Sequence, residues 1–225
     1  MNKITIQALF DLDRTIARDL LAAAVYPWDV LDGLRTYICT LGPTLPADRF
    51  SQIAPDVWAA NSAKIAPTAS ISGPCIIDED AEIRHCAFIR GSAIVGRGAV
   101  VGNSTELKNC ILFDGAQVPH FNYVGDSILG YRAHMGAGAV TSNVKGNHTN
   151  VTVYAEDGAI ETGRRKLGAM LGDEAEIGCG SVLNPGTVIG RRTQVYPLVS
   201  VRGIIGADCI CKAAGCVVSR EARQG

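Results

Sequence analysis

The sequence predicts a mainly β protein in which a parallel β-helix of six-residue repeats follows a short helical region. Three observations predict this fold class: an aliphatic residue returns at every sixth position, a small side chain stands two positions before most of them, and the 225 residues include 25 glycines. A period of six fits neither a helix nor a simple alternating strand, but it fits a short strand and a tight turn repeated around a prism.

The repeat runs through most of the chain and is interrupted once. Its first block consists of the aliphatic residues Ile65, Ile71, Ile77, Ile83, Ile89, Val95, Val101 and Leu107. The phase then slips by one residue at Leu112 and again at Leu129, before a long insertion at about 142–168. The period resumes at Leu171 and continues to Val201. Since three units close one coil, we expect roughly six to seven stacked coils with strands paired in parallel.

The chain is expected to contain three segments. Residues 1–60 form an N-terminal helical extension, in which 14–25 and 30–41 have the apolar spacing of two helices that cap or brace the coil. Residues 61–206 form the β-helix with its inserted loop, and 207–225 form a C-terminal tail.

Composition and charge disfavour several classes of function. The chain has 21 Lys and Arg against 22 Asp and Glu, without a basic tract, so nucleic acid and membrane partners are not expected. The longest apolar stretch, Leu20–Trp28, is too short to span a bilayer and lacks the flanks of a signal peptide, so we expect a cytoplasmic protein. The 8 cysteines are accordingly expected to be reduced thiols.

Polar residues concentrate between Val101 and Asn143, where a coil that only had to stack would not require them. This segment resembles the acetyltransferase domain of the bifunctional glucosamine-1-phosphate acetyltransferase/N-acetylglucosamine-1-phosphate uridylyltransferase, with which it aligns without gaps. The later stretch Thr162–Ala169 resembles the C-terminal acetyltransferase domains of archaeal sugar-1-phosphate nucleotidylyltransferases. Together the resemblance covers about Ile65 to Val201.

The resemblance has implications for fold, activity and assembly. It implies a left-handed coil, because the periodicity itself does not set the hand. It implies an acyltransferase that N-acetylates an amino-sugar phosphate, glucosamine 1-phosphate or galactosamine 1-phosphate, from acetyl-CoA. It also implies a homotrimer with the site between neighbouring prisms.

Two residues are implied to be catalytic. His120 matches the general base that takes a proton from the sugar amine as the amine attacks the thioester. Imidazole suits this role because its ordinary pKa lies close to neutrality, and base catalysis of this type gives roughly 10²–10⁴-fold. Glu106 is the candidate to orient His120 through a hydrogen bond between carboxylate and imidazole.

Five residues are implied to bind the sugar phosphate. Arg90 and Lys108 match the cations that hold the phosphate, a dianion that requires charge-assisted donors. Tyr123 matches a sugar-binding residue, and Asn143 lies in the matching substrate loop. His134 stands where the bifunctional enzyme has an Asn near the reacting amine.

Three positions match the acetyl-CoA side of the site. Ala137 lies within Gly136-Ala137-Gly138, which matches the segment whose backbone N–H meets the thioester oxygen. Cys179 and Pro197 replace a family Ser and a family Ala. Cations of the insertion, including Lys145, are candidates to contact a phosphate or CoA, and a plain surface loop is an equal alternative.

Other functions are open to the same fold. A sugar-phosphate-binding protein without turnover is one alternative, because residues 134, 179 and 197 depart from the family pattern. A metal hydratase of the γ-carbonic anhydrase type needs three histidines around a metal, whereas only 4 histidines occur and position 125 is Gly125, so no metal is expected. Nucleotidylyltransferase activity is not expected, since residues 1–64 contain neither a glycine-rich nucleotide loop nor a large α/β domain.

Overall fold

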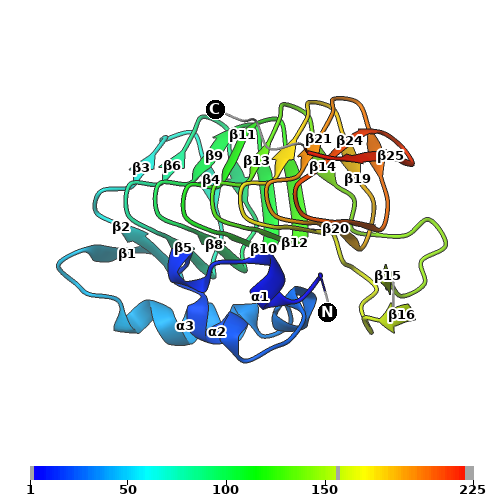
Figure 1. Ribbon diagram of the computed structural model, residues 1–225. Coiled ribbons are helices and arrows are strands. Elements are labelled where there is room, and N and C mark those ends of the chain that lie inside the picture. The colour runs from blue at the N-terminus through cyan, green and yellow to red at the C-terminus, as the bar shows by residue number, and fades with distance from the viewer. Residues whose placement is uncertain (1–2, 156–157, 221–225) are drawn as a thin grey trace.

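The computed structural model describes residues 3–155 and 158–220. In this structure the chain winds into a three-sided prism of stacked coils, with a short helical region along its side (Figure 1). The predicted fold class, a left-handed parallel β-helix with a short N-terminal helical region, is confirmed.

Each side of the prism is a ladder of short parallel strands. Face 1 contains β4 (Ser70–Ile71), β7 (Phe88–Ile89), β10 (Glu106–Leu112), β12 (Tyr123–Leu129), β14 (Val140–Thr141), β19 (Val182–Leu183) and β22 (Ser200–Val201). Face 2 contains β2 (Val57–Ala60), β5 (Cys75–Ile77), β8 (Ala93–Val95), the second halves of β10 and β12, β17 (Ala169–Leu171), β20 (Thr187–Ile189) and β23 (Ile204–Ile205).

Face 3 completes the prism. It contains β3 (Lys64–Ile65), β6 (Glu82–Ile83), β9 (Val100–Asn103), β11 (Gln117–His120), β13 (His134–Met135), β18 (Glu176–Ile177), β21 (Gln194–Val195) and β24 (Cys209–Ala213). An antiparallel strand closes each end, with β1 (Phe50–Ala54) on β2 and β25 (Cys216–Ser219) on β24. The segment after residue 206, expected as a tail, thus continues face 3 through β24 before it turns back.

The interior of the prism follows the six-residue repeat. The aliphatic residues of the repeat, such as Ile83, Ile89 and Val101, are at most 1% exposed and stack on one another along the axis with small partners such as Ala87. Face 2 has eight rungs among the described residues, more than the predicted six to seven, because β2 and β23 lie outside the span of the aliphatic repeat.

The two phase slips in the sequence have a structural cause. β10 and β12 run without interruption around the corner between faces 1 and 2, where the earlier coil uses one residue more between β7 and β8. Asn109 and Asp126 stand at this corner with positive φ angles of 51° and 50°. Asn109 and Asp126 therefore occupy equivalent positions on successive coils, one above the other.

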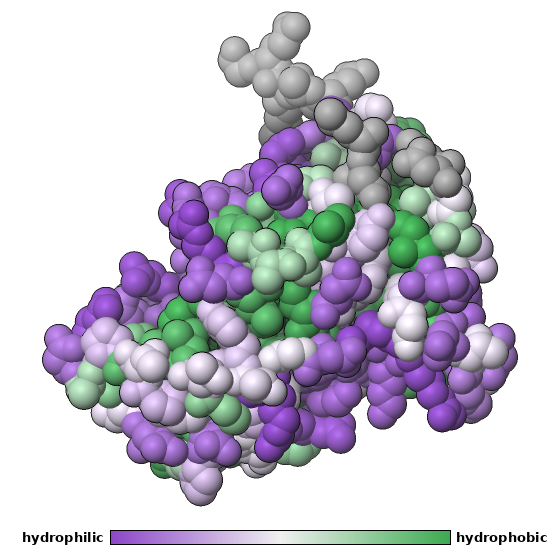
Figure 2. All heavy atoms as spheres, turned by 90° about the horizontal axis from the view of Figure 1, so that it is seen from below, coloured by the Kyte–Doolittle hydropathy of each residue, from purple (hydrophilic) through white to green (hydrophobic). Residues whose placement is uncertain are grey.

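The helices lie along face 2 rather than over an end of the coil (Figure 1). They are α1 (Ile6–Leu9), α2 (Arg18–Ala22) and α3 (Leu34–Leu41). The 3₁₀ turns Leu12–Arg14 and Pro27–Val30 join them, and a third, Gly42–Thr44, follows α3. Outward side chains of face 2 form one buried apolar cluster with them, including Trp58, Ile76, Ile94, Ile111, Ile128, Met170 and Val188. Figure 2, which looks onto this helical side, shows apolar side chains gathered near its middle within a hydrophilic surround.

The insertion between β14 and β17 is folded back onto the prism. It contains an antiparallel hairpin of β15 (Thr152–Ala155) and β16 (Gly158–Glu161). Val151 and Val153 are each 1% exposed and join the apolar cluster on face 2. None of the helices in the described residues is long and apolar enough to cross a bilayer.

Candidate active site

Two sets of side chains point outward near face 1. One set lies on face 1 and at its corner with face 2, and it includes Arg90, Lys108, Tyr123 and Asn143. The other set lies at the corner between faces 3 and 1, where His120 ends β11. Apart from His134, the sequence-predicted residues thus lie along face 1 and its two edges.

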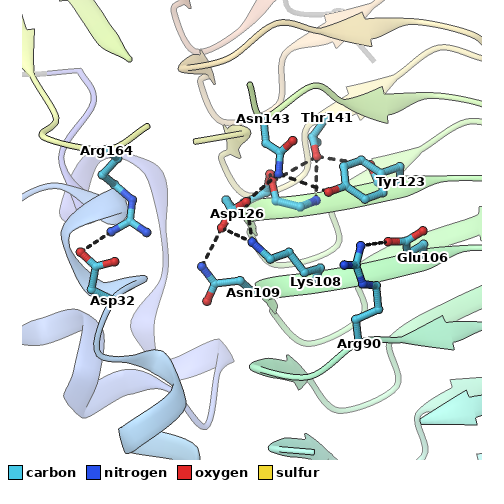
Figure 3. Close-up of polar contacts among 12 residues, drawn as sticks. Asp32, Arg90, Glu106, Lys108, Asn109, Tyr123, Asp126, Thr141, Asn143 and Arg164 are labelled. Atoms are coloured by element: carbon cyan, nitrogen blue, oxygen red, sulfur yellow. Dashed lines mark hydrogen bonds and ion pairs between the residues drawn. The ribbon is translucent and has the colours of Figure 1, made fainter. Parts of the chain in front are cut away.

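Asp126 joins three of the predicted residues into one cluster (Figure 3). Its carboxylate accepts from Lys108 Nζ at 3.0 and 3.1 Å, and from Asn143 Nδ2 at 2.6 Å. Asn109 Nδ2 adds a further donor at 2.8 Å, and Asn143 Nδ2 also lies 3.2 Å from the Tyr123 hydroxyl. Because Asp126 is only 2% exposed, these donors replace the water that its charge would otherwise bind.

The local chain explains why these groups meet. Strand register sets Lys108 beside Gly125, and Asp126 follows at the corner. The missing side chain of Gly125 leaves room for the Tyr123 ring, since a Cβ at position 125 would lie 2.4 Å from the Tyr123 hydroxyl oxygen. Burial, and then the charges of Asp126 and Glu106, raise the pKa of Tyr123, so its hydroxyl keeps its proton at neutral pH.

Arg90 and Glu106 form a separate ion pair on the neighbouring coils of face 1. Arg90 Nη1 lies 2.7 Å from Glu106 Oε1, and both side chains are partly exposed. Glu106 therefore contacts Arg90 rather than His120, in contrast to the orienting contact suggested by the sequence. Figure 3 shows this pair beside the Asp126 cluster and separate from it.

His120 lies at the corner between faces 3 and 1 with an exposed imidazole. Its backbone N–H donates to Asn122 Oδ1 at 3.1 Å, and the buried Asn122 amide in turn donates to the carbonyls of Gly136 and Ala139. No hydrogen bond involves the imidazole within the described part of the chain. The backbone of His120 is thus fixed while its ring faces solvent.

The residues predicted to contact acetyl-CoA continue from His120 along the same corner. The His120 carbonyl accepts from Gly138 N–H, the Ala137 carbonyl from Gly180 N–H, and the Cys179 carbonyl from Leu198 N–H. His120, Ala137, Cys179 and Pro197 therefore occupy equivalent positions on successive coils, and we call this row the His120 corner. Within the described residues, the N–H of Ala137 makes no hydrogen bond and is available to a ligand.

His134 lies apart from the other predicted binding residues. It is on β13 of face 3, where its Nδ1 lies 3.0 Å from Glu176 Oε2 on the adjacent β18. Within one chain, His134 and the Lys108 cluster are on different faces of the prism. No group of three or more His, Cys, Asp or Glu side chains among the described residues is arranged to hold a metal ion.

Sequence reasoning missed three residues that organise this region: Asn109, Asn122 and Asp126. The signal for Asp126 is a carboxylate between the apolar residues of β12, 18 residues beyond Lys108. Asn122 gives no such signal, because its role is to bond backbone carbonyls of the next coil.

Comparison with known proteins finds several proteins to which this chain is similar. A model described as the GMPPB C-terminal domain matches residues 71–164. The bifunctional sugar-1-phosphate nucleotidylyltransferase/acetyltransferase of Sulfurisphaera tokodaii is 30% identical over 168 residues, which are 67% of this chain and 42% of that protein. The chain is similar to both, and its six-residue repeat runs through the segment that the domain model matches.

Two further relatives are similar to this chain at about the same level of identity. The bifunctional protein GlmU of Methanococcus maripaludis is 30% identical over 203 residues, 82% of this chain and 43% of that protein. The uncharacterized acetyltransferase YaiX of Escherichia coli is 32% identical over 148 residues, 66% of this chain and 64% of that protein. The chain therefore spans less than half the length of the two bifunctional relatives.

Proposed function

We propose that this protein transfers an acetyl group from acetyl-CoA to the amine of an amino sugar that carries a phosphate, glucosamine 1-phosphate or galactosamine 1-phosphate. The observation that carries the proposal is the arrangement of the His120 corner. An exposed imidazole and an unpartnered backbone N–H lie on successive coils, beside a face that presents Arg90 and Lys108.

The chemistry requires a base and an oxyanion donor close together. The amine nitrogen of the sugar attacks the thioester carbonyl carbon, and His120 accepts the proton that the nitrogen loses. The Ala137 N–H would stabilise the negative charge that develops on the carbonyl oxygen. The C–S bond then breaks, the amide remains on the sugar, and CoA leaves as a thiolate that takes up a proton.

The cations of face 1 would hold the phosphate. Arg90 and Lys108 are each paired with a carboxylate, but neither side chain is closed off from solvent, at 48% and 28% exposure. A phosphate dianion would share these cations with Glu106 and Asp126, and the carboxylates would keep the cations oriented before the substrate arrives. Tyr123 and Asn143 lie where sugar hydroxyls could hydrogen-bond to them.

We further propose that the site is completed between chains of a homotrimer. Within one chain, His134 is separated from the Lys108 cluster. His120 and Ala137 of the His120 corner are exposed to solvent. A neighbouring prism packed against this corner would enclose both substrates. These substrates are cytoplasmic metabolites, and we expect the protein in that compartment.

The proposal is tested by following thiol release from acetyl-CoA with a set of acceptors. We expect release with glucosamine 1-phosphate or galactosamine 1-phosphate, and none with N-acetylglucosamine 1-phosphate, whose amine is already acylated. Binding of the sugar phosphate without thiol release would instead support a non-catalytic sugar-phosphate-binding protein. Light scattering of the same sample would report whether a trimer forms.

A further inference from the structure

A cavity of about 660 Å³ adjoins the candidate site on face 1. It forms where the insertion folds back beside the later coils, and its volume lies within the range of ligand pockets. Ser142 and Val144, the two neighbours of Asn143, line its near end, and Arg202 lines its far end. The cavity therefore lies next to Asn143, which is a member of the Asp126 cluster.

The wall contributed by the insertion is fixed to the prism. Val151 and Val153 are buried, and Gly186 permits their close approach, since a Cβ at position 186 would lie 2.7 Å from Val151 Cγ1. Arg164 Nη1 pairs with Asp32 Oδ2 of the helical region at 2.7 Å, which ties the return of the insertion to the other side of the fold. The insertion wall of the cavity is thus held against the prism and the helical region.

The lining favours a ligand with negative charge. Lys145 and Arg202 are the charged residues that line the cavity, and no described acidic residue does. Lys145 Nζ donates to the Asn150 carbonyl at 3.0 Å, which leaves two of its three N–H groups for a ligand. Arg202 is exposed and has no ion pair or hydrogen bond to any described residue.

The lining also contains side chains that could contact a nucleobase and a ribose. Tyr154, on β15 at the rim, is 70% exposed, and an aromatic ring of this kind can stack on a nucleobase. Asn184 donates from Nδ2 to Ser200 Oγ and the Val201 carbonyl, which leaves Oδ1 to accept from a ribose hydroxyl. Two cations, an aromatic ring and a polar amide together match a nucleoside diphosphate.

The spacing along face 1 relates this cavity to the sugar site. Strand register places Lys108, Gly125, Ser142, Asn184 and Arg202 on successive coils in one column. At about 4.8 Å per coil, Ser142 lies about 10 Å from Lys108 and Arg202 about 19 Å. A diphosphate attached to a sugar at Lys108 would therefore run along this column into the cavity.

We propose that this cavity binds the nucleoside diphosphate portion of a nucleotide-linked amino sugar. This inference rests on the proposed acetyl transfer and extends its acceptor: the sugar 1-phosphate would be the portion held at Lys108 of a larger acceptor, an amino sugar joined through a diphosphate to a nucleoside. The acceptor is favoured over CoA as the occupant because the column from Lys108 and Asn143 leads directly into the cavity, whereas the positions assigned to CoA lie along the opposite edge of face 1.

Equilibrium binding tests the proposal without requiring turnover. UDP, GDP, ADP and CoA are titrated into the full-length protein and into the variants Arg202→Glu and Lys145→Glu, with Arg35→Glu, an exposed cation on α3, as the control. We expect one nucleoside diphosphate to bind, and each cavity variant to weaken it by about tenfold to a hundredfold, the loss of a charge-assisted contact. Arg35→Glu should bind like the unmodified protein.

Several results would overturn the proposal. They are the absence of binding by every nucleoside diphosphate, unchanged affinity in both cavity variants, and a loss confined to CoA. Thermal unfolding of each variant identifies a folding defect, and the milder Arg202→Gln then replaces Arg202→Glu. Failure of acetyl transfer is a separate result, because His120→Ala should lose transfer and still bind the nucleoside diphosphate.

Discussion

The carbonyl oxygen of His120 accepts a hydrogen bond from the backbone N–H of Gly138 at 3.0 Å. This contact fixes the distance between the proposed base and the next coil, where Ala137 presents an N–H without a partner. A reacting carbonyl between these two groups would meet a proton acceptor and a hydrogen-bond donor on the same corner. The predictions below begin with this donor.

Replacing Ala137 with Pro removes the N–H without removing a hydrogen bond of the fold. Pro197 occupies the equivalent position two coils later, so the corner accepts a proline ring there. We expect kcat to fall by about 10²–10³, as the loss of an oxyanion donor does elsewhere, with an unchanged circular dichroism spectrum. Ala137→Ser keeps the N–H and is the matched control. Equal kcat in the Pro and Ser variants would remove Ala137 from the mechanism.

Lys108→Met leaves the buried Asp126 carboxylate without its cation. We expect the free energy of unfolding at pH 7.5 to fall by about 1–3 kcal/mol, since Asn109 and Asn143 remain as donors. The double variant Lys108→Met/Asp126→Asn should recover part of the loss at pH 7.5. Urea titrations of the single and double variants at pH 7.5 measure this, and no recovery in the double variant would contradict the account.

The cysteines should differ sharply in reactivity. Burial raises the pKa of Cys75 to about 12, and it also raises the pKa of Cys110, whereas Cys86, Cys179 and Cys216 are exposed. Since the thiolate is the reactive form, iodoacetamide at pH 8 should alkylate the exposed three and leave Cys75 and Cys110 intact until urea is added. Peptide mass spectrometry reads the result. Alkylation of Cys75 at the rate of Cys86 would show that the prism interior opens readily.

The outward side chains of face 2 should be as important to stability as the interior. Ile111 points away from the prism axis, but it is 0% exposed beneath the helices. Ile111→Ala should lower the free energy of unfolding by about 2–5 kcal/mol, the range for a buried aliphatic truncation. Val100→Ala, at a partly exposed outward position of face 3, should cost much less in the same urea titration. Similar losses would argue against a docked helical region.

The repeat itself could be predicted closely because every coil requires apolar side chains at the same inward positions. Ile83, Ile89 and Val101 point into the axis as their spacing indicates, since an inward position cannot tolerate a polar side chain. The place of the helices could not be predicted in the same way. The isoleucines at 76, 94 and 111 follow inward positions directly and blend into the apolar repeat, so they do not reveal a second buried face.

The contacts among the candidate site residues could not be predicted from the sequence. Lys108, Tyr123 and Asn143 lie close together because Asp126 and Asn143 join them, and their roles in binding substrate stay a prediction. Glu106 lies next to Arg90 because strand pairing sets β7 beside β10, a relation between residues 16 positions apart. Such side-chain pairings depend on coil register and on corner length, and both follow from the one-residue slips at β10 and β12.

The most direct test of the proposed acetyl transfer is thiol release from acetyl-CoA with glucosamine 1-phosphate as acceptor, compared between His120→Ala and His85→Ala. His85 occupies the equivalent corner position two coils earlier and is also exposed, so it controls for loss of an imidazole on this edge. We predict that His120→Ala loses about 10²–10⁴-fold in rate with unchanged thermal unfolding, and that His85→Ala keeps its rate. Equal turnover by the two variants would contradict the role of His120 as the base.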